Sequence, residues 1–320
     1  MNSLKKPTAV RVATSAFAAA VGVVLFSVYC SLPAANANGG ADGALLEVGR
    51  GVVKTSQPPA APVGLKVVSY NMRWRGGEDL KALIELLRTD AEIGGASIIG
   101  LQEVDRNKKR TDHTNTARVI AEALGMHYAW AAPPVKEGEE EETGVAILSP
   151  HELRDVTRLV LPHEGPGKRR RAAVGATVQI GETLVRVYSV HAETRLDLAK
   201  KVEQWGAVLE DLKRHPQVSR AVVLGDFNTI KGKDVRAARK LFDGAGFVTP
   251  FPDDHTTWRT FPFKLKLDWL WLRGFEAGEF GIDKQVGLSD HWPLWVELKL
   301  GEHVSPPPVA AAPLASPRPR

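Results

Sequence analysis

Short apolar runs that end in polar motifs constrain this chain more than any other feature of its sequence. V-V-L-G precedes D-F-N-T, and the turn G-L-S precedes D-H-W-P, so that Asp226, Asn228, Asp290 and His291 lie directly beside apolar segments. Alone, either motif is compatible with loop capping and turn chemistry. Two more motifs, S-Y-N-M-R-W and I-I-G-L-Q-E-V-D, follow earlier apolar runs. Four such motifs favour a site at strand ends, where α/β sheets place their sites.

The first residues differ from the rest of the chain. Three basic residues precede an uncharged apolar stretch, 12–32, which is followed by the small-x-small pattern of Ala35 and Ala37. These three parts are those of a secretory signal peptide, and we expect cleavage after Ala37 and an exported protein, periplasmic or secreted. The alternative is an uncleaved membrane anchor, because the apolar stretch is just long enough to span a bilayer.

Cleavage at that point changes the composition of the chain. The single cysteine, Cys30, would be removed, so the exported protein would have no disulfide and would depend on its core for stability. Three of the 42 basic residues would also be lost, which leaves 39 against 37 acidic residues and a net charge of +2. This charge is far from the basic footprint of a dedicated nucleic-acid binder.

The rest of the sequence divides into a linker, one domain and a tail. Residues 38–64 are rich in Gly, Ala and Pro and are predicted to be a linker. Residues 301–320 are rich in Pro and Ala and are predicted to be disordered. The segment 65–300 between them, without visible internal repeats, is predicted to fold as one domain.

Apolar runs and helical patterns alternate along this domain. Asp79 is expected to cap a first helix, and two further helices are predicted over 116–124 and 197–212. Strands are predicted over 65–70, 97–101, 145–148, 172–180, 183–189, 221–224, 267–272 and 295–300. Hairpins mixed with helical crossovers fit an α/β or α+β domain in which two mixed sheets pack face to face under helices.

The four polar motifs, in the order N, QE, GDFN and SDH, resemble those of the endonuclease/exonuclease/phosphatase superfamily of metal-dependent phosphoesterases. The resemblance covers about residues 65–300. It implies the family's four-layer α/β sandwich, a pancreatic-deoxyribonuclease-like fold, and hydrolysis of a phosphate ester. It also implies a metal at the site, which we expect to be Mg²⁺, with Mn²⁺ or Ca²⁺ as alternatives.

Residues for metal binding and water activation follow from the same motifs. Glu103 follows a buried strand and is our principal ligand, because Mg²⁺ prefers one or two carboxylates together with waters and substrate oxygens. By resemblance, Asn71 and Asp290 lie at the same metal and phosphate edge. Asp226 and Asn228 are then expected to orient or deprotonate the attacking water, and an Asp that acts as a base near neutral pH needs a raised pKa.

His291 needs a partner that fixes its tautomer and supports a positive charge. In the family this partner is an Asp on the preceding strand, here Asp268 in K-L-D-W-L-W-L. A carboxylate in so apolar a strand is costly unless it is paired, and a structural salt bridge is the alternative interpretation.

A second histidine, His191, follows the run V-Y-S-V at another strand end. Pancreatic-type nucleases carry a catalytic His at this point, supported by a Glu before an earlier strand, and Glu142 matches that position. Arg171 is expected to clamp a phosphate, with Arg170 as the alternative.

One departure narrows the family branch. Abasic-site endonucleases carry a metal-binding Asp two residues after the Asn, whereas Arg73 stands at that position here, as in the branch of pancreatic-type deoxyribonucleases. We therefore expect an exported, Mg²⁺-dependent monomer that cleaves a phosphodiester or phosphomonoester, such as a phospholipid head group at a membrane surface or a small phosphodiester. A secreted non-specific nuclease and a catalytically silent binding module on the same fold remain as alternatives.

Overall fold

Two β-sheets and four α-helices form the fold in this computed structural model, which describes residues 45–50, 64–135, 142–260 and 262–299. The first sheet has the strand order β1-β4-β5-β3-β2-β14-β13, and the second β12-β9-β8-β7-β6. Within each sheet one pair of central strands is parallel, β2 with β3 and β8 with β9, and the other pairs are antiparallel.

The bounds of the elements are as follows. The first sheet contains β1 (Leu46–Gly49), β2 (Gly64–Asn71), β3 (Ile98–Arg106), β4 (His127–Ala131), β5 (Glu142–Ser149), β13 (Glu276–Ile282) and β14 (Leu294–Lys299). The second contains β6 (Leu153–Val160), β7 (Ala172–Ile180), β8 (Thr183–His191), β9 (Arg220–Asp226) and β12 (Asp268–Arg273). A separate hairpin pairs β10 (Trp258–Thr260) with β11 (Phe263–Leu265). The helices are α1 (Gly77–Thr89), α2 (Thr116–Leu124), α3 (Leu198–Leu212) and α4 (Gly232–Gly244), with short 3-10 turns at η2 (Lys109–Thr111) and η3 (Pro166–Lys168).

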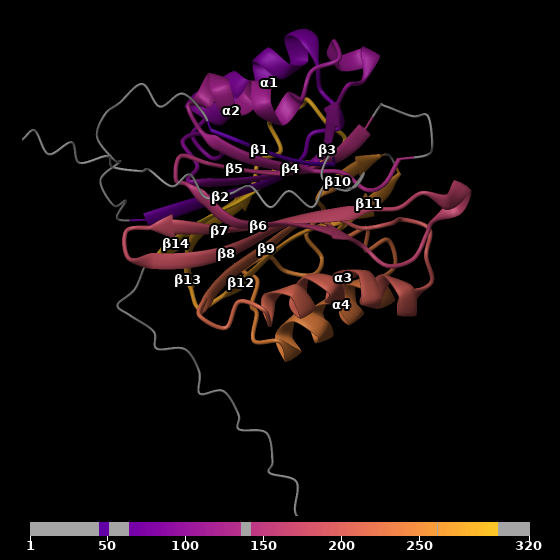
Figure 1. Ribbon diagram of the computed structural model, residues 1–320. Helices are drawn as coiled ribbons and strands as arrows, with labels where there is room; N and C mark the ends of the chain where they lie inside the picture. Colours follow the sequence, from indigo (N-terminus) through magenta and orange to yellow (C-terminus); the bar gives the residue numbers. More distant parts are fainter. Residues whose placement is uncertain (1–44, 51–63, 136–141, 261, 300–320) are drawn as a thin grey trace, which may run out of the picture. The chain divides into compact units, whose positions relative to one another are not determined.

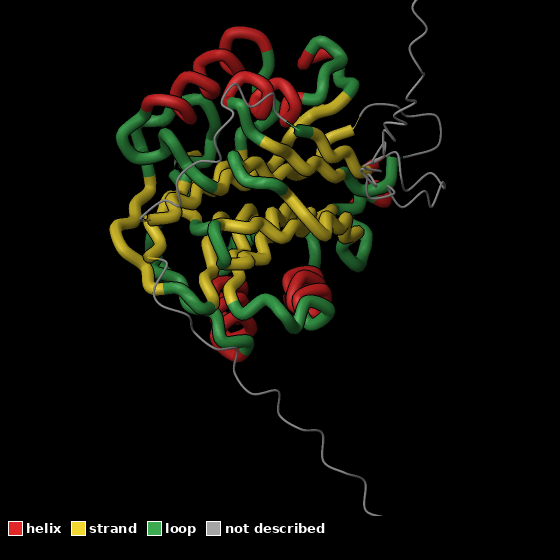
Figure 2. Tube along the Cα trace, turned by 60° about the vertical axis from the view of Figure 1, so that its left-hand side comes forward, coloured by secondary structure: helices red, strands yellow, loops and turns green. Residues whose placement is uncertain are grey.

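These elements make four layers, which confirms the predicted sandwich. The two sheets face each other, with α1 and α2 on the outer face of the first and α3 and α4 on the outer face of the second (Figures 1 and 2). One apolar cluster fills the space between the sheets, and one lies under each pair of helices. Alternate residues of each central strand therefore point into the inter-sheet core and the others toward a helix layer.

The structure corrects two of the predicted boundaries, the start of the first helix and the start of the folded domain. Asp79 does not cap α1, because the N-cap is Gly76 and the Asp79 carboxylate pairs with Arg75. Within the predicted linker 38–64, Leu46–Gly49 pair with β4, so the folded domain begins before residue 65. The predicted signal segment 1–37 and the tail 301–320 lie outside the described residues. Among the helices that the structure describes, none is long and apolar enough to cross a membrane.

The two sheets are in close contact beneath the polar strand ends. A Cβ atom added to Gly100 of β3 would lie 1.9 Å from Leu224 Cδ1 of β9. Close by, Gln102 Nε2 donates to Ser189 Oγ at 3.0 Å, and Ser189 Oγ donates to the Leu101 carbonyl at 3.0 Å. Apolar packing and these two hydrogen bonds together fix the spacing of the sheets at this end.

Gly100→Ala should therefore lower the free energy of unfolding by about 1–3 kcal/mol, because the added methyl overpacks the inter-sheet core. Gly206→Ala is the matched control. Nothing lies within 4 Å of a Cβ added to this residue of α3, and Ala stabilises a helix interior by about 0.5–1 kcal/mol relative to Gly. Urea denaturation of both variants measures the two effects, and equal stabilities would contradict this packing.

Candidate active site

Strand register brings three predicted residues together on the second sheet. Asp226 at the end of β9 is paired with His191 of β8 on one side and with Asp268 of β12 on the other. Paired residues share a face, and this face also carries Leu224 and Leu270, which belong to the inter-sheet core. Three buried polar side chains therefore continue an apolar row at the point where it reaches the sheet edge.

The first sheet supplies its own polar pair opposite. Asn71 and Gln102 are neighbours on the parallel strands β2 and β3, and both continue the rows that begin with the inward-facing Val67 and Ile98. Asn71 is 1% exposed and Gln102 is fully buried. Both sheets thus end their apolar interior in hydrogen-bonding groups at the same edge.

Glu103 reaches this edge through a break in the strand. Regular alternation would place it on the helix-facing side, but β3 is bulged between Gln102 and Val104, and Glu103 has a φ of 56°. Val104 instead continues the row that packs under α1 and α2. The bulge turns the Glu103 carboxylate into the site, where Oε1 accepts from Asn71 Nδ2 at 3.2 Å. A left-handed conformation at a non-glycine residue is a common feature of functional sites.

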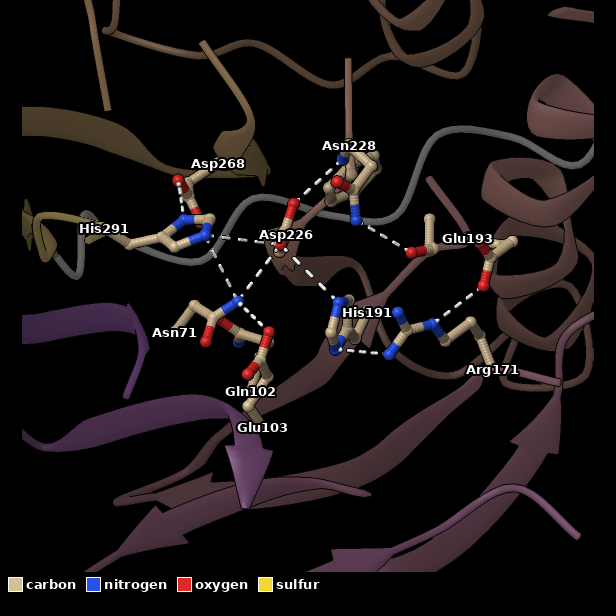
Figure 3. A network of polar contacts seen from close by, with 12 residues as sticks. Asn71, Gln102, Glu103, Arg171, His191, Glu193, Asp226, Asn228, Asp268 and His291 are labelled. Carbon is tan, nitrogen blue, oxygen red and sulfur yellow. Dashed lines mark hydrogen bonds and ion pairs between the residues drawn. The ribbon is translucent and has the colours of Figure 1, made fainter. Parts of the chain in front are cut away.

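The carboxylate of Asp226 is the centre of the site. Its Oδ2 lies 3.1 Å from Asn71 Nδ2, 3.6 Å from His191 Nε2 and 3.8 Å from His291 Nε2 (Figure 3). Its Oδ1 accepts from the backbone N–H of Asn228 at 2.9 Å. Burial raises the pKa of Asp226 to about 7, with further contributions from the nearby carboxylates of Asp268 and Glu103.

His291 and Asp268 form the pair that the sequence predicts. His291 Nδ1 lies 2.8 Å from Asp268 Oδ2. The same Asp268 oxygen also accepts a hydrogen bond from Thr257 Oγ1 at 2.7 Å. Burial alone lowers the pKa of His291, but the carboxylates of Asp268, Asp226 and Asp290 outweigh it and raise the pKa to about 10. His291 is therefore a cation at neutral pH, with both ring nitrogens protonated.

His191 differs from His291 in its protonation state. Arg171 Nη1 lies 3.3 Å from His191 Nδ1, and because a guanidinium only donates, Nδ1 must accept and the ring proton must be on Nε2. Burial, together with the positive charges of Arg171, His291 and Arg169, lowers the pKa of His191 well below its usual value. His191 is therefore neutral and directs an N–H toward Asp226.

The predicted support of His191 by Glu142 is wrong in this structure. Both oxygens of Glu142 accept from Arg106, at 2.9 Å each, so its carboxylate is neutralised on β3. The carboxylate that acts behind His191 is Glu193, which is fully buried and binds Arg169 at 2.7 Å and Arg171 at 3.2 Å. Arg171, predicted to clamp a phosphate, is thus held between Glu193 and His191 with its side chain 17% exposed.

Two residues predicted as metal ligands hold other partners. Asn71 Oδ1 accepts from the backbone N–H of Arg73, so the side chain presents its amide nitrogen, not its oxygen, to Glu103 and Asp226. The carboxylate of Asp290 accepts from Trp258 Nε1 at 3.2 Å and pairs with Arg73 at 3.3 Å. Both side chains are thus held by protein donors, and their coordination of a cation stays a prediction.

Asn228 supports the site through its backbone. Its side-chain amide donates to the Ala192 carbonyl at 2.9 Å, and its left-handed backbone, with a φ of 52°, aims its N–H at Asp226. The loop after β9 is thereby tied to the end of β8. Asn228 therefore fixes the Asp226 carboxylate through its backbone N–H, and its contact with the attacking water stays a prediction.

Two groups of side chains offer donor atoms to a cation. Asp226, Asp268 and His291 each provide an atom within 4.8 Å of the others, but His291 Nδ1 and Asp268 Oδ2 already bind each other. Glu103 has a half-buried carboxylate whose hydrogen-bond partner among the described residues is the neutral Asn71 amide. The donor set therefore fits a hard divalent cation at Glu103, with waters and substrate oxygens completing its shell.

Sequence reasoning missed Glu193 and Thr257, which support His191 and Asp268. The signal for Glu193 is its position in H-A-E, two residues after His191 and on the same side of the strand end. Thr257 lies in a loop outside every predicted element, and its Oγ1 also accepts from the backbone N–H groups of Leu267 and Asp268. No local pattern in the sequence identifies that contact.

The raised pKa of His291 predicts a pH-dependent stability. Between its ordinary value of 6.5 and about 10, the folded chain binds one more proton than the unfolded chain. The stabilisation is complete below about pH 6.5 and is lost as the pH rises through about 10. Urea unfolding in EDTA should therefore show that the stability difference between wild type and His291→Gln falls by roughly 1 kcal/mol per pH unit over this interval. A difference that does not vary with pH would show that His291 is neutral in the folded protein.

Comparison with known proteins identifies one family and many solved structures with the same fold. The sequence profile described as the Endonuclease/Exonuclease/phosphatase family matches residues 68–291. This range contains all four polar motifs and every residue of the site described above. Curated protein sequences give no significant match.

Solved structures share the fold at low sequence identity. An endonuclease/exonuclease/phosphatase from Beutenbergia cavernae aligns with a TM-score of 0.62 at 19% identity, covering 75% of this chain and 72% of that one. The human nocturnin catalytic domain with bound sulfate gives 0.55 at 18%, covering 73% and 94%. A mannosyl-6-phosphatase from Bacteroides thetaiotaomicron gives 0.55 at 16%, covering 73% and 99%. At identities this low, the structural matches establish a shared fold and nothing more.

Proposed function

The chain belongs to the endonuclease/exonuclease/phosphatase family, and we propose from this membership and from its site that it hydrolyses a phosphate ester by in-line attack of water at phosphorus. One observation carries the proposal. Three N–H-bearing side chains, Asn71, His191 and His291, surround the buried Asp226 Oδ2, one as a neutral imidazole and one as a cation. Such a set can bind an anionic phosphoryl group and activate water beside it.

Asp226 is the residue that takes the proton from water. A general base works best when its pKa lies near the working pH, and burial raises the pKa of Asp226 to about 7. The Asn228 N–H fixes one of its oxygens and leaves Oδ2 toward the donors. The carboxylate is therefore held rigidly and has proton affinity enough to accept a proton at neutral pH.

The two histidines stabilise the charge that builds up on oxygen. His291, held by Asp268, donates from Nε2 as a cation. Its electrostatic stabilisation of a developing oxyanion becomes stronger when water is excluded from the site. His191, held by Arg171, donates from Nε2 while neutral. Their partners act through orientation, because each fixes the nitrogen that does not face the substrate.

We propose Mg²⁺ as the cofactor, with Mn²⁺ or Ca²⁺ as alternatives, and Glu103 as its protein ligand. When bound, the cation would neutralise phosphoryl oxygens and support the departing oxygen. Asn71 holds Glu103 and Asp226 at a common distance through one amide nitrogen. A mannosyl-6-phosphatase and a sphingomyelinase C from Streptomyces griseocarneus share this architecture and differ by name in their substrates, so the fold alone does not select the ester.

The proposed substrate is a small phosphate ester outside the cytoplasm. The net charge of +2 that remains after cleavage of residues 1–37 favours a small ester or a phospholipid head group over long nucleic acid. Export itself is proposed from the three-part N-terminal signal, and N-terminal sequencing of secreted protein tests it. A silent binding module is disfavoured, because the structure brings Asn71, Glu103, His191, Asp226, Asp268 and His291 to one edge.

An activity screen tests the proposal directly. Purified protein should hydrolyse at least one of bis-p-nitrophenyl phosphate, inositol phosphates, sphingomyelin and plasmid DNA, and EDTA should abolish the activity. Glu103→Gln should lower kcat by about two orders of magnitude and raise the Mg²⁺ concentration needed for half-maximal rate. Exposed Glu203 on α3 provides the control, since Glu203→Gln should leave both values unchanged. Full activity of the Glu103 variant in EDTA would refute the metal assignment.

The pairing of His291 with Asp268 makes a separate prediction. His291→Ala and Asp268→Asn should each lower kcat by about two to three orders of magnitude, as expected when a donor to a developing oxyanion is lost. The double variant should be little worse than either single variant, because residues that act as a unit are not additive. Kinetics with bis-p-nitrophenyl phosphate measure the three losses. Additive losses at unchanged folding would show that Asp268 is only structural.

A further inference from the structure

A cavity lies next to the active site on the side of the α3–α4 layer. One wall is the loop 194–198, which follows Glu193, and the other is the segment 230–234, which follows Asn228. Both walls therefore continue directly from the strand ends that carry His191 and Asp226. Helices α3 and α4, which start at these walls, lie side by side on the outer face of the second sheet (Figures 1 and 2).

The cavity carries an excess of positive charge. Arg195, Lys231 and Lys233 line it, all three are exposed, and none of their side chains has an ion-pair partner within the parts of the chain that the structure describes. Two acidic residues also line it, but both are neutralised. Asp197 pairs with Lys200 at 3.3 Å and caps α3, while Asp234 pairs with Lys201 at 3.0 Å. Three uncompensated cations therefore surround one hollow.

Lys201 links this hollow to the catalytic loop. Its side chain is 3% exposed, and Nζ donates to the Asn228 carbonyl at 2.8 Å and to Asp234 Oδ2 at 3.0 Å. An ammonium group has three N–H donors, so one donor of this buried, cavity-lining residue has no acceptor among the described residues. An anion bound in the cavity would supply an acceptor for this donor.

The apolar residues of the lining limit the chemical class of ligand that the cavity can bind. Ile230, which is 37% exposed, and Leu196 both line the cavity. An anionic group attached to a carbon framework would satisfy both features, with the anion at the cations and carbon atoms against the aliphatic side chains. A quaternary ammonium group would face three positive charges here.

We propose that this cavity binds a second phosphate group of the substrate, one that is not cleaved. The inference rests on the proposed phosphoesterase function and specifies its substrate class: a small ester carrying at least two phosphates, either a nucleotide or a polyol phosphate. It disfavours the zwitterionic choline head group of sphingomyelin. The shared chemistry is a remote phosphate dianion beside a sugar or polyol ring.

Phosphate binding can be tested without turnover. Two-dimensional amide NMR of the wild-type protein in EDTA, titrated with inorganic phosphate, should show saturable shifts at residues 194–198 and 230–234. In the double variant Lys231→Ala/Lys233→Ala, the apparent Kd obtained from these shifts should rise by about tenfold or more, since the loss of even one charged contact is worth about that factor. Lys240→Ala removes an exposed lysine from the same helix, outside the cavity lining, and should leave them unchanged.

Kinetics then identify the source of the phosphate. The ratio of kcat/KM for a two-phosphate substrate to that for bis-p-nitrophenyl phosphate should fall about tenfold or more in the double lysine variant and remain constant in Lys240→Ala. A nucleoside bisphosphate and an inositol bisphosphate form the two arms, and a fall in either arm supports the proposal and names the framework.

The outcomes separate this inference from the function beneath it. Phosphate shifts that occur only around Asp226 and His191, with 230–234 unmoved, would overturn the second site even if the protein is active. An unchanged kinetic ratio in both arms would overturn it as well. Complete inactivity on all substrates would refute the phosphoesterase proposal, whereas phosphate shifts at 230–234 that depend on Lys231 and Lys233 would still establish the anion site.

Discussion

The site depends on one buried carboxylate, Asp226, held at the meeting point of two sheets. An unpaired charge at this depth would cost several kcal/mol, so the structure must supply donors from both sides. Asn71 on β2 and His291 in the loop before β14 come from the first sheet, and His191 and the Asn228 amide come from the second sheet and its loop. The inter-sheet packing at Gly100 and the Gln102–Ser189 hydrogen bond maintain the spacing that this arrangement requires.

Two histidines beside the same carboxylate differ because their second nitrogens meet opposite charges. His291 faces the carboxylate of Asp268 and is held as a cation. His191 faces the guanidinium of Arg171, which Glu193 fixes in turn, and is held neutral. The site can therefore offer one strong and one weak hydrogen-bond donor without bringing two like charges together. Asp268 and Arg171 set this difference, because each contacts the histidine nitrogen that is turned away from Asp226.

Much of the fold follows from the sequence, since the helix 116–124 and the strands 172–180 and 183–189 are regular and strongly patterned. The polar strand ends also predict the site, because register and two-residue alternation carry Asn71 and Asp226 to the same edge. The bulge at Glu103 and the loop contact of Thr257 could not be predicted, because they depend on tertiary packing. Glu142 fits the family's spacing but binds Arg106 instead, which shows that a motif position does not determine a side chain's partner.

The opposite protonation of the two histidines is the central claim, and heteronuclear NMR of their imidazole nitrogens during a pH titration tests it most directly. Between about pH 5 and about pH 9, His291 should keep both ring nitrogens protonated, and His191 should remain a single neutral tautomer with its proton on Nε2. The variants His191→Gln and His291→Gln assign the signals. If both histidines instead titrate together near pH 6.5, their partners do not control them and the account is wrong.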